Sequence, residues 1–299
     1  MTFLEPFTFP VSGVHTWLWL PPLVAFCVSA ITSTAGITGS FLLLPFQISV
    51  LGFTSPAVSA TNLVYNIVST PGGIFRFMRE KRLIWPLAGA IVLGTLPGVV
   101  IGGLVRLRWL PDPGRFRIFA GCVMLYIGSR LLLGLRRGTD RPAGGNGDFN
   151  VEITSASWPV LSYRFQEEEY RCGFRGLFFL SFVVGIVGSI YGIGGGAIIS
   201  PFLVSFYRLP VHTVAGATLV GTCASSVAGV LFYALAAPFY PGLVITPDWL
   251  LGTLFGLGGL AGTYLGARMQ RHIPAFRLKL LLGVIVLSVA LKYLAGALG

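Results

Sequence analysis

Long apolar segments separated by short polar turns run through almost the whole chain. They cover residues 21–35, 41–52, 57–75, 83–105 and 116–135 in the first half, and 174–191, 197–207, 213–236, 249–267 and 276–298 in the second. The ten-residue alternation of barrel strands is missing, so the pattern predicts an all-α membrane bundle. The second segment of each half would cover only about 18 Å as a helix, which is too short for a ~30 Å hydrocarbon core. We therefore expect the first two segments of each half to form a re-entrant hairpin or a pair of short, tilted helices.

The two halves are copies of one another. Residues 36–77 return as residues 192–233 at a constant offset of 156, without a gap, and 11 of these 42 positions are identical. Glycines interrupt both copies where a helix should continue, just before a short apolar run. Duplicated halves with broken helices are typical of secondary transporters whose site lies near the bilayer midplane.

The charge of equivalent loops predicts that the two repeats are inverted. The loop after residues 57–75 contains four basic residues, Arg76, Arg79, Lys81 and Arg82, whereas its counterpart at residues 237–248 contains none. By the positive-inside rule, these loops lie on opposite sides of the membrane. With the first loop in the cytoplasm, the four arginines from Arg106 to Arg117 fall in an outer loop, against the rule.

Composition agrees with a membrane location. Hydrophobic residues make up 54% of the chain and charged residues 10%, with a mean hydropathy of +0.81. A water-soluble protein of this length would need more polar surface. The net charge of +11 is explained by basic residues retained in cytoplasmic loops, so no nucleic-acid partner is expected.

We divide the chain into three parts. Residues 17–136 form the first membrane repeat and residues 173–298 the second. Residues 137–172 form a cytoplasmic linker, in which a glycine-rich turn and a polar alternation predict a short hairpin. We expect a multi-pass protein of the bacterial inner membrane, in contact with the lipid bilayer.

The glycine breaks are the first candidate for a binding site. A helix that begins inside the membrane directs unpaired amide groups and its positive dipole end at the midplane, where an anion can bind without a charged side chain. The small anionic substrate is therefore expected between two sets of residues: Gly36, Thr38, Gly39 and Ser40 in the first half, and Gly192, Gly194, Gly195 and Gly196 in the second. Close crossing of packed helices is the structural alternative.

Polar residues after the breaks are the second candidate. Their spacing of three and four residues places several on one helical face, where amides and hydroxyls can donate to an oxyanion. The candidates are Asn62, Asn66 and Ser69 in the first half, and Thr218, Thr222 and Ser225 in the second. Hydrogen bonding between packed helices is again the alternative.

Two further sets of glycines predict packing rather than binding. Gly94, Gly98 and Gly102 recur at every fourth residue, and Gly258, Gly262 and Gly266 do the same. Such seams let helices approach closely, within one chain or between chains. A homodimer is compatible with them.

The inventory of reactive side chains argues against an enzyme. All ten carboxylates fall in loops or at the predicted membrane edges, and no His, Asp and Glu constellation lies inside the apolar segments. A catalytic nucleophile with its base, or a metal cluster, would need such groups at matching depth. We expect no catalytic residues, no metal and no cofactor.

With these residues in view, the chain resembles the sulfite exporter TauE/SafE family. The resemblance rests on residues 192–196, Pro201 and Phe202, residues 214–218, and Ser225 with Ser226, and extends over both halves. It implies export of a sulfur-containing anion, such as sulfite, sulfoacetate or another organosulfonate, across the bacterial inner membrane. The first half departs from the motif, because Thr38 and Ser40 stand where the second half has Gly194 and Gly196.

The sequence thus favours a secondary transporter that exports such an anion by alternating access. An anion channel is one alternative, and a transporter of another anion, such as thiosulfate or a carboxylate, is a second. A membrane scaffold that transports nothing is a third.

Overall fold

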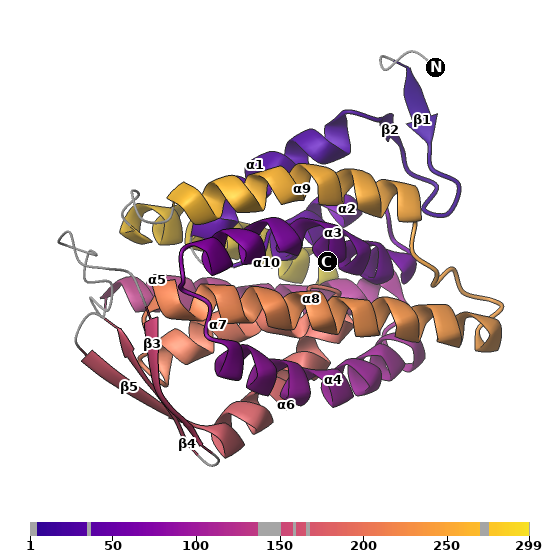
Figure 1. The fold of residues 1–299 in the computed structure, drawn as a ribbon. Helices are drawn as coiled ribbons and strands as arrows, with labels where there is room; N and C mark the ends of the chain where they lie inside the picture. Colours follow the sequence, from indigo (N-terminus) through magenta and orange to yellow (C-terminus); the bar gives the residue numbers. More distant parts are fainter. Residues whose placement is uncertain are drawn as a thin grey trace.

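The apolar segments fold into helices that follow the expected order. The computed structural model describes residues 5–34, 37–136, 151–157, 160–165, 168–269 and 275–298. The first-half helices are α1 (Leu20–Thr34), α2 (Ser40–Ser49), α3 (Ala57–Arg79), α4 (Trp85–Arg108) and α5 (Pro113–Arg136). The second-half helices are α6 (Phe174–Tyr191), α7 (Gly195–Ser205), α8 (Val211–Ala236) with the 3₁₀ turn η1 (Ala237–Phe239), α9 (Trp249–Met269) and α10 (Ala275–Leu298). The expectation of a helical membrane protein is therefore confirmed (Figure 1).

Some helices are long and apolar enough to cross a membrane, whereas α2 and α7 are too short. Within the described ranges, α4, α6, α8 with η1, and α9 are long and apolar enough to cross a membrane. In contrast, α2 has 10 residues and α7 has 11. At about 1.5 Å per residue, these two helices reach only roughly half-way across a hydrocarbon core.

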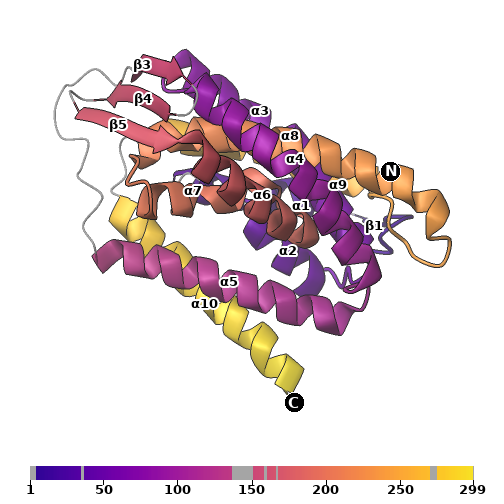
Figure 2. The same cartoon turned by 90° about the horizontal axis from the view of Figure 1, so that it is seen from below.

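A β-sheet and a β-hairpin mark opposite ends of the bundle (Figures 1 and 2). The sheet contains the strands β3 (Val151–Ser157), β4 (Val160–Phe165) and β5 (Glu168–Gly173), in the order β3-β4-β5 and antiparallel. The hairpin consists of β1 (Pro6–Thr8) and β2 (His15–Trp17). We call these the sheet end and the hairpin end.

The linker forms three strands where a two-stranded hairpin was expected. The alternation in β4 turns Leu161, Tyr163 and Phe165 to one buried face, and Cys172 of β5 is also buried. The Tyr163 hydroxyl lies 2.9 Å from Oγ1 of Thr213 in α8, which fixes the sheet against that helix. Burial raises the pKa of the Cys172 thiol to about 11, so this thiol is neutral at pH 7.

The loops that the charge pattern distinguished lie at opposite ends. The backbone N–H of Val151 in β3 donates to the carbonyl of Lys81, which places the loop after α3 at the sheet end. At the hairpin end, the Asp248 carboxylate accepts hydrogen bonds from the backbone N–H and the hydroxyl of Ser12, at 3.0 and 2.8 Å. Asp248 also caps α9 by accepting from the N–H of Leu251 at 3.1 Å.

The short helix α2 runs back toward the end of the bundle at which α1 begins. In the same way, α7 runs back toward the end at which α6 begins. The α1–α2 pair begins next to β2, and the N–H of Ala57, at the start of α3, donates to Val244 in the loop at the hairpin end. The α6–α7 pair begins directly after β5, and Thr213, at the start of α8, contacts Tyr163 of the sheet. The two pairs therefore enter the bundle from opposite ends.

Equivalent helices of the two halves pack against one another reciprocally. A Cβ on Gly73 of α3 would contact Leu219 of α8, and a Cβ on Gly229 of α8 would contact Leu63 of α3. Leu63 is equivalent to Leu219, and Gly73 to Gly229. Because residues early in one helix meet residues late in the other, α3 and α8 are antiparallel.

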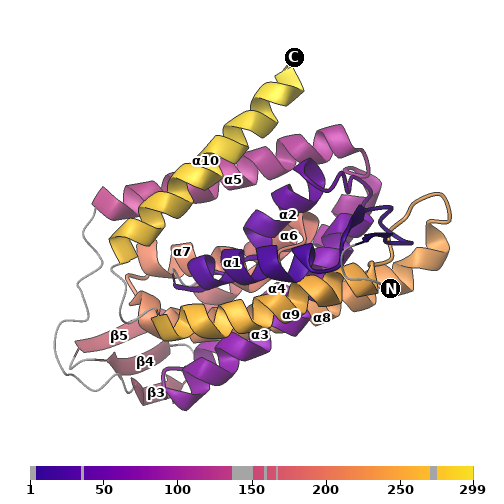
Figure 3. The same cartoon turned by 90° about the horizontal axis from the view of Figure 1, so that it is seen from above.

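The pair α5 and α10, side by side in Figure 3, repeats this reciprocity. Gly121 faces Leu294, and Gly283 faces Leu132. Leu132 lies eleven positions after Gly121, and Leu294 lies eleven positions after Gly283. Each glycine therefore contacts the leucine that belongs to the other glycine's helix. The helices of these two pairs therefore contact one another reciprocally.

The two glycine seams lie within the chain. Cβ atoms on Gly94, Gly98 and Gly102 of α4 would fall 2.3–2.7 Å from backbone carbonyl oxygens of α6. Those on Gly258, Gly262 and Gly266 of α9 would fall 1.9–2.6 Å from carbonyl oxygens of α1. The prediction of close-packing seams is confirmed, and both seams join helices of different halves, so they no longer argue for a dimer.

Candidate functional site

Glycines break the helix in the second half. Helix α6 ends at Tyr191, and Gly192 follows in the left-handed region with φ +84°. Gly194 has φ +74°, and α7 begins at Gly195. Side chains are strained at positive φ, so this turn requires glycine. We call residues 192–194 the second break.

Two glycines of this region allow close approach to α8. A Cβ on Gly196 would lie 1.9 Å from the carbonyl oxygen of Thr218 and 2.5 Å from the backbone nitrogen of Thr222. A Cβ on Gly194 would lie 3.0 Å from Oγ of Ser226 and 3.2 Å from Oγ of Ser225. The sequence therefore brings the start of α7 into contact with the hydroxyl-bearing face of α8.

We call residues 37–40 the first break, which includes the first residue of α2 and has the side chains of Thr38 and Ser40 in place of two glycines of the second half. Gly36 lies outside the described residues. Oγ1 of Thr38 and Oγ of Ser40 are 2.7 Å apart, and both side chains are buried. Gly39 has no space for a Cβ, because the Tyr65 hydroxyl, bonded to Ser29 at 2.7 Å, would lie 2.6 Å from it.

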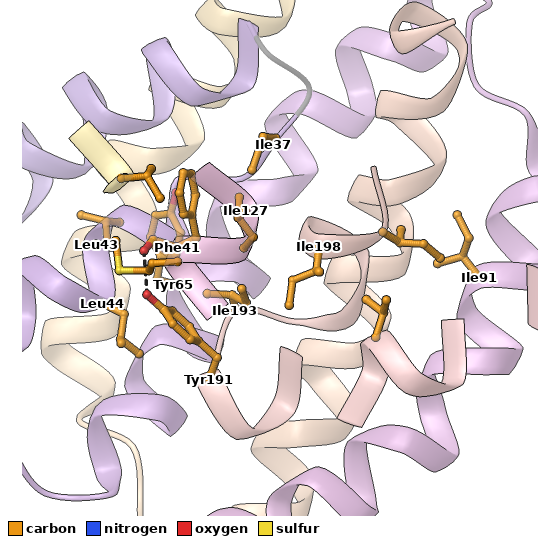
Figure 4. Packing of buried hydrophobic residues seen from close by; sticks show 14 of the residues in the cluster. Ile37, Phe41, Leu43, Leu44, Tyr65, Ile91, Ile127, Tyr191, Ile193 and Ile198 are labelled. Atoms are coloured by element: carbon orange, nitrogen blue, oxygen red, sulfur yellow. Dashed lines mark hydrogen bonds between the residues drawn. The ribbon is translucent and has the colours of Figure 1, made fainter. Parts of the chain in front are cut away.

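The two breaks meet in the interior. The hydroxyl of Ser40, the first residue of α2, donates to the carbonyl oxygen of Ile193 at 3.3 Å. Ile37 and Ile193, one from each break, belong to the same buried cluster as Phe41 and Tyr191 (Figure 4). The Tyr191 hydroxyl donates to the Phe41 carbonyl at 3.1 Å. Residues 153 positions apart therefore form one site, into which α2 and α7 both begin.

Two asparagines of α3 stabilise this meeting point. Nδ2 of Asn62 donates to the carbonyl oxygens of Gly192 at 2.9 Å and of Ser40 at 3.0 Å, and thereby links both breaks. Nδ2 of Asn66 donates to the Ile193 carbonyl at 3.0 Å. Non-helical backbone inside a membrane bundle needs such partners, because lipid supplies none. The amide nitrogens are thus occupied by protein, and direct contact of either asparagine with an anion stays a prediction.

The equivalent residues of α8 mostly bond to their own helix. The hydroxyl of Thr218 donates to Ala215 and that of Thr222 to Thr218, both at 2.9 Å. Ser225 differs, because its Oγ accepts the N–H of Gly195 at 3.0 Å while donating to the Thr222 carbonyl. Ser225 therefore caps the N-terminus of α7.

Several buried polar atoms around the breaks have no hydrogen-bond partner within the described ranges. They are Oδ1 of Asn66, Oγ of Ser69, Oγ of Ser226 and Oε1 of Gln47. Buried polar atoms are usually satisfied, so unpaired ones mark a place for a water or a ligand. Sequence reasoning proposed Asn66 and Ser69, but it missed Gln47, which becomes visible only through the bond from its Nε2 to Oδ1 of Asn62 at 3.3 Å.

The site is electrically neutral in its side chains. None of the described helices contains Asp or Glu. No group of three or more His, Cys, Asp or Glu side chains lies together in the part of the chain that the structure describes. The remaining polarity comes from hydroxyls, amides and the N-terminal dipoles of α2 and α7, an arrangement that favours an anion.

Comparison with known proteins agrees with this arrangement. The family described as "Sulfite exporter TauE/SafE" matches residues 22–293, which includes both breaks. The chain belongs to this family. It is accordingly a membrane transporter and not an enzyme.

The individual relatives share low sequence identity with this chain. A probable membrane transporter protein of Xylella fastidiosa (strain Temecula1) is 24% identical over 257 residues, which is 85% of either chain. The probable membrane transporter protein YunE of Bacillus subtilis is 20% identical over 269 residues, covering 86% of this chain and 90% of that protein. No solved structure matches the chain.

Proposed function

We propose that this TauE/SafE family member is a secondary transporter that exports a small sulfur-containing anion across the bacterial inner membrane by alternating access. The family description names sulfite, and we include sulfoacetate and related organosulfonates among the proposed substrates. The observation that carries the proposal is the contact of the two breaks through Ser40 and Ile193, which brings two buried helix starts to one neutral site.

Inverted repeats are part of the proposal. The antiparallel, reciprocal packing of α3 on α8 supports a two-fold axis perpendicular to these helices. If the helices run along the membrane normal, that axis lies in the membrane plane, as it does in inverted-repeat transporters. The opposite positions of the loops that contain Lys81 and Asp248 support the same arrangement.

The anion would lie between the N-termini of α2 and α7. The N-cap residue of α2, Gly39, has no side chain to satisfy the first amides of that helix. Hydroxyls of Thr38, Ser40 and Ser225 lie at the same helix starts and can reorient toward an oxyanion. Such a neutral cradle binds an anion without a cation that would hold it permanently.

Alternating access requires the halves to move against each other. The hydrogen bonds from Asn62, Asn66 and Ser40 to the second break all cross between halves. A rocking motion about the break must exchange these bonds, and a bound anion can take up donors that become free. The membrane potential favours the outward step by about 2.3 kcal/mol per charge per 100 mV, so coupling to a proton through a buried carboxylate is unnecessary.

Reconstituted protein tests this function. Proteoliposomes loaded with sulfite, with an imposed inside-negative potential, should release it faster than protein-free liposomes. The initial rate should saturate with internal concentration, and external sulfite should accelerate exchange of labelled sulfite. Release that neither saturates nor shows counterflow would indicate a channel. If thiosulfate or acetate competes with sulfite for transport and sulfoacetate does not, the substrate belongs to a different class.

A further inference from the structure

A second polar cluster lies at the hairpin end, away from the contact of the two breaks. Arg106, in the last turn of α4, has no exposed surface. Its Nε donates to Oγ of Ser59 at 3.3 Å, and its guanidinium carbon lies 3.8 Å from the centre of the Phe116 ring. Its Nη1 donates to the carbonyl of Leu110.

Among the described residues, this guanidinium has no counter-ion. No carboxylate within the described ranges forms an ion pair with it, and its Nη2, fully buried, has no hydrogen-bond partner. Arginine does not lose its proton in proteins, and a buried cation is costly unless it is paired. The site is therefore incomplete by one negative charge.

The other buried arginine shows what a completed site looks like. Arg82, at the sheet end, is also almost fully buried, but it forms an ion pair with Glu80 and stacks on Phe77 with its guanidinium 4.7 Å from the ring centre. Arg106 has the stacking ring and lacks the carboxylate. A mobile anion can supply the missing charge.

A buried tyrosine adds a second donor. Tyr233 of α8 lies close to Arg106 and Ser59, and its buried hydroxyl forms no hydrogen bond of normal geometry in the described part of the chain. The equivalents of Ser59 and Tyr233 in the other half are Ala215 and Phe77. Both hydroxyls are thus missing from the equivalent place, so this cluster exists at one end only.

The cluster is directly connected to the second break. Oγ of Ser59 donates to the carbonyl oxygen of Ile190 at 3.5 Å, and a Cβ on Gly192 would lie 2.6 Å from Cα of Ser59. The ring of Phe116, under the guanidinium, lies 6.4 Å from that of Tyr191, the last residue of α6. One serine therefore separates Arg106 from the place where the helix is broken.

We propose that Arg106, Ser59 and Tyr233 form a second anion site, which takes up a sulfite or sulfonate group from the breaks at the hairpin end. This proposal rests on the proposed function, and on the positive-inside assignment it faces the extracytoplasmic side. The cluster receives the oxyanion through Nη2 of Arg106 and the Tyr233 hydroxyl, while Ser59 and Phe116 hold the guanidinium. Because the buried arginine at the sheet end is paired with Glu80, the unpaired charge of Arg106 favours movement of the anion toward the hairpin end.

Anion binding to purified protein tests the site without requiring transport. Binding of sulfite and sulfoacetate is measured by calorimetry and by thermal shift for the wild type, Arg106→Gln, Tyr233→Phe and Arg108→Gln. Arg108 is the matched control, because it lies two residues away on the same helix and is exposed. We expect Arg106→Gln to weaken binding roughly tenfold or more, and Tyr233→Phe to weaken it less. Arg108→Gln should bind like the wild type.

The stability without ligand separates binding from a structural role. Removal of an uncompensated buried charge should leave the Tm of Arg106→Gln unchanged or raise it, and should reduce the Tm increase that sulfite causes. A lower Tm with an unchanged sulfite effect would overturn the proposal. The same holds if Tyr233→Phe, which keeps the ring, binds sulfite as the wild type does, or if no anion binds to the wild type.

Two further arms identify the ligand and isolate the proposed function. Stabilisation of the wild type by phosphatidylglycerol in phosphatidylcholine nanodiscs, with no effect of sulfite, would assign Arg106 to a lipid headgroup and overturn the proposal. Binding that depends on Arg106 in a protein that shows no flux in proteoliposomes would leave the anion site standing and would overturn the proposed function instead.

Discussion

The two breaks occupy equivalent positions in duplicated halves, yet they are built from different chemistry. The second break needs backbone freedom, because Gly192 and Gly194 have positive φ and Gly196 touches the backbone of α8. The first break has Thr38 and Ser40 at the positions of Gly194 and Gly196, and it contributes hydroxyls instead. At the breaks themselves, the second half supplies glycine backbone and the first half supplies hydroxyl side chains.

The helices that follow the breaks have diverged in the same way. The amides of Asn62 and Asn66 reach across to the second break, whereas the shorter hydroxyls of Thr218 and Thr222 reach only carbonyls of α8. Around the breaks, most hydrogen bonds between the halves therefore have the donor in the first half and the acceptor in the second. The two halves share the order of their helices, but substitution has made the two sides of the site unequal.

Exchanging one residue between the breaks should give the largest effect. Gly196→Ser copies the first-half residue into a place where its Cβ would lie 1.9 Å from the Thr218 carbonyl oxygen. Because backbone atoms cannot move aside, we expect a loss of about 3 kcal/mol or more and little folded protein. The reverse exchange, Ser40→Gly, loses two hydrogen bonds and should cost about 1–2 kcal/mol.

Both variants are compared by Tm in detergent and by the monodisperse fraction in size-exclusion chromatography. The order of the two effects is the critical result. A Gly196→Ser protein as stable as the wild type would mean that α7 and α8 are not in backbone contact.

The bonds between halves give the next largest difference. Asn62→Ala leaves the buried Gly192 carbonyl without its side-chain donor, which costs about 1–3 kcal/mol, and removes the bond to Ser40 as well. Thr218→Ala removes a bond within one helix and should cost at most about 1 kcal/mol. Thermal unfolding of both variants measures the difference, and equal Tm values would contradict the one-directional arrangement.

Much of the fold follows from the sequence, because its signals are local. Apolar length fixed which segments were too short to span, and every fourth glycine marked the seams in α4 and α9 before their partners were known. The partners, α6 and α1, could not be predicted, since a seam of small residues fits any helix and does not distinguish a contact within the chain from one between chains.

The site was harder to predict, because its contacts are non-local. Sequence reasoning placed donors on α3, but the acceptors at Gly192 and Ile193 lie about 130 residues away. Arg106 was assigned to an outer loop because the apolar segment ends at residue 105, whereas the structure buries it in the last turn of α4. Only the tertiary packing shows that its neighbours are hydroxyls and a ring rather than water.

The smallest change in stability should come from the hydroxyl next to Gly194. Oγ of Ser226 is buried and has no hydrogen-bond partner among the described residues, whereas Thr70, at the equivalent first-half position, donates to the Asn66 carbonyl at 2.7 Å. Ser226→Ala removes an unsatisfied group, so we expect a change in unfolding free energy within about 1 kcal/mol, and Thr70→Ala should behave similarly.

Anion binding should separate the Ser226→Ala and Thr70→Ala variants, because of the two hydroxyls only that of Ser226 faces the second break with a free donor. We expect sulfite affinity to fall roughly two- to tenfold in Ser226→Ala and to stay unchanged in Thr70→Ala, as measured by calorimetry. Unchanged affinity in both would place the anion on the side of Thr38 and Ser40, and the glycines of the second break would then serve packing alone.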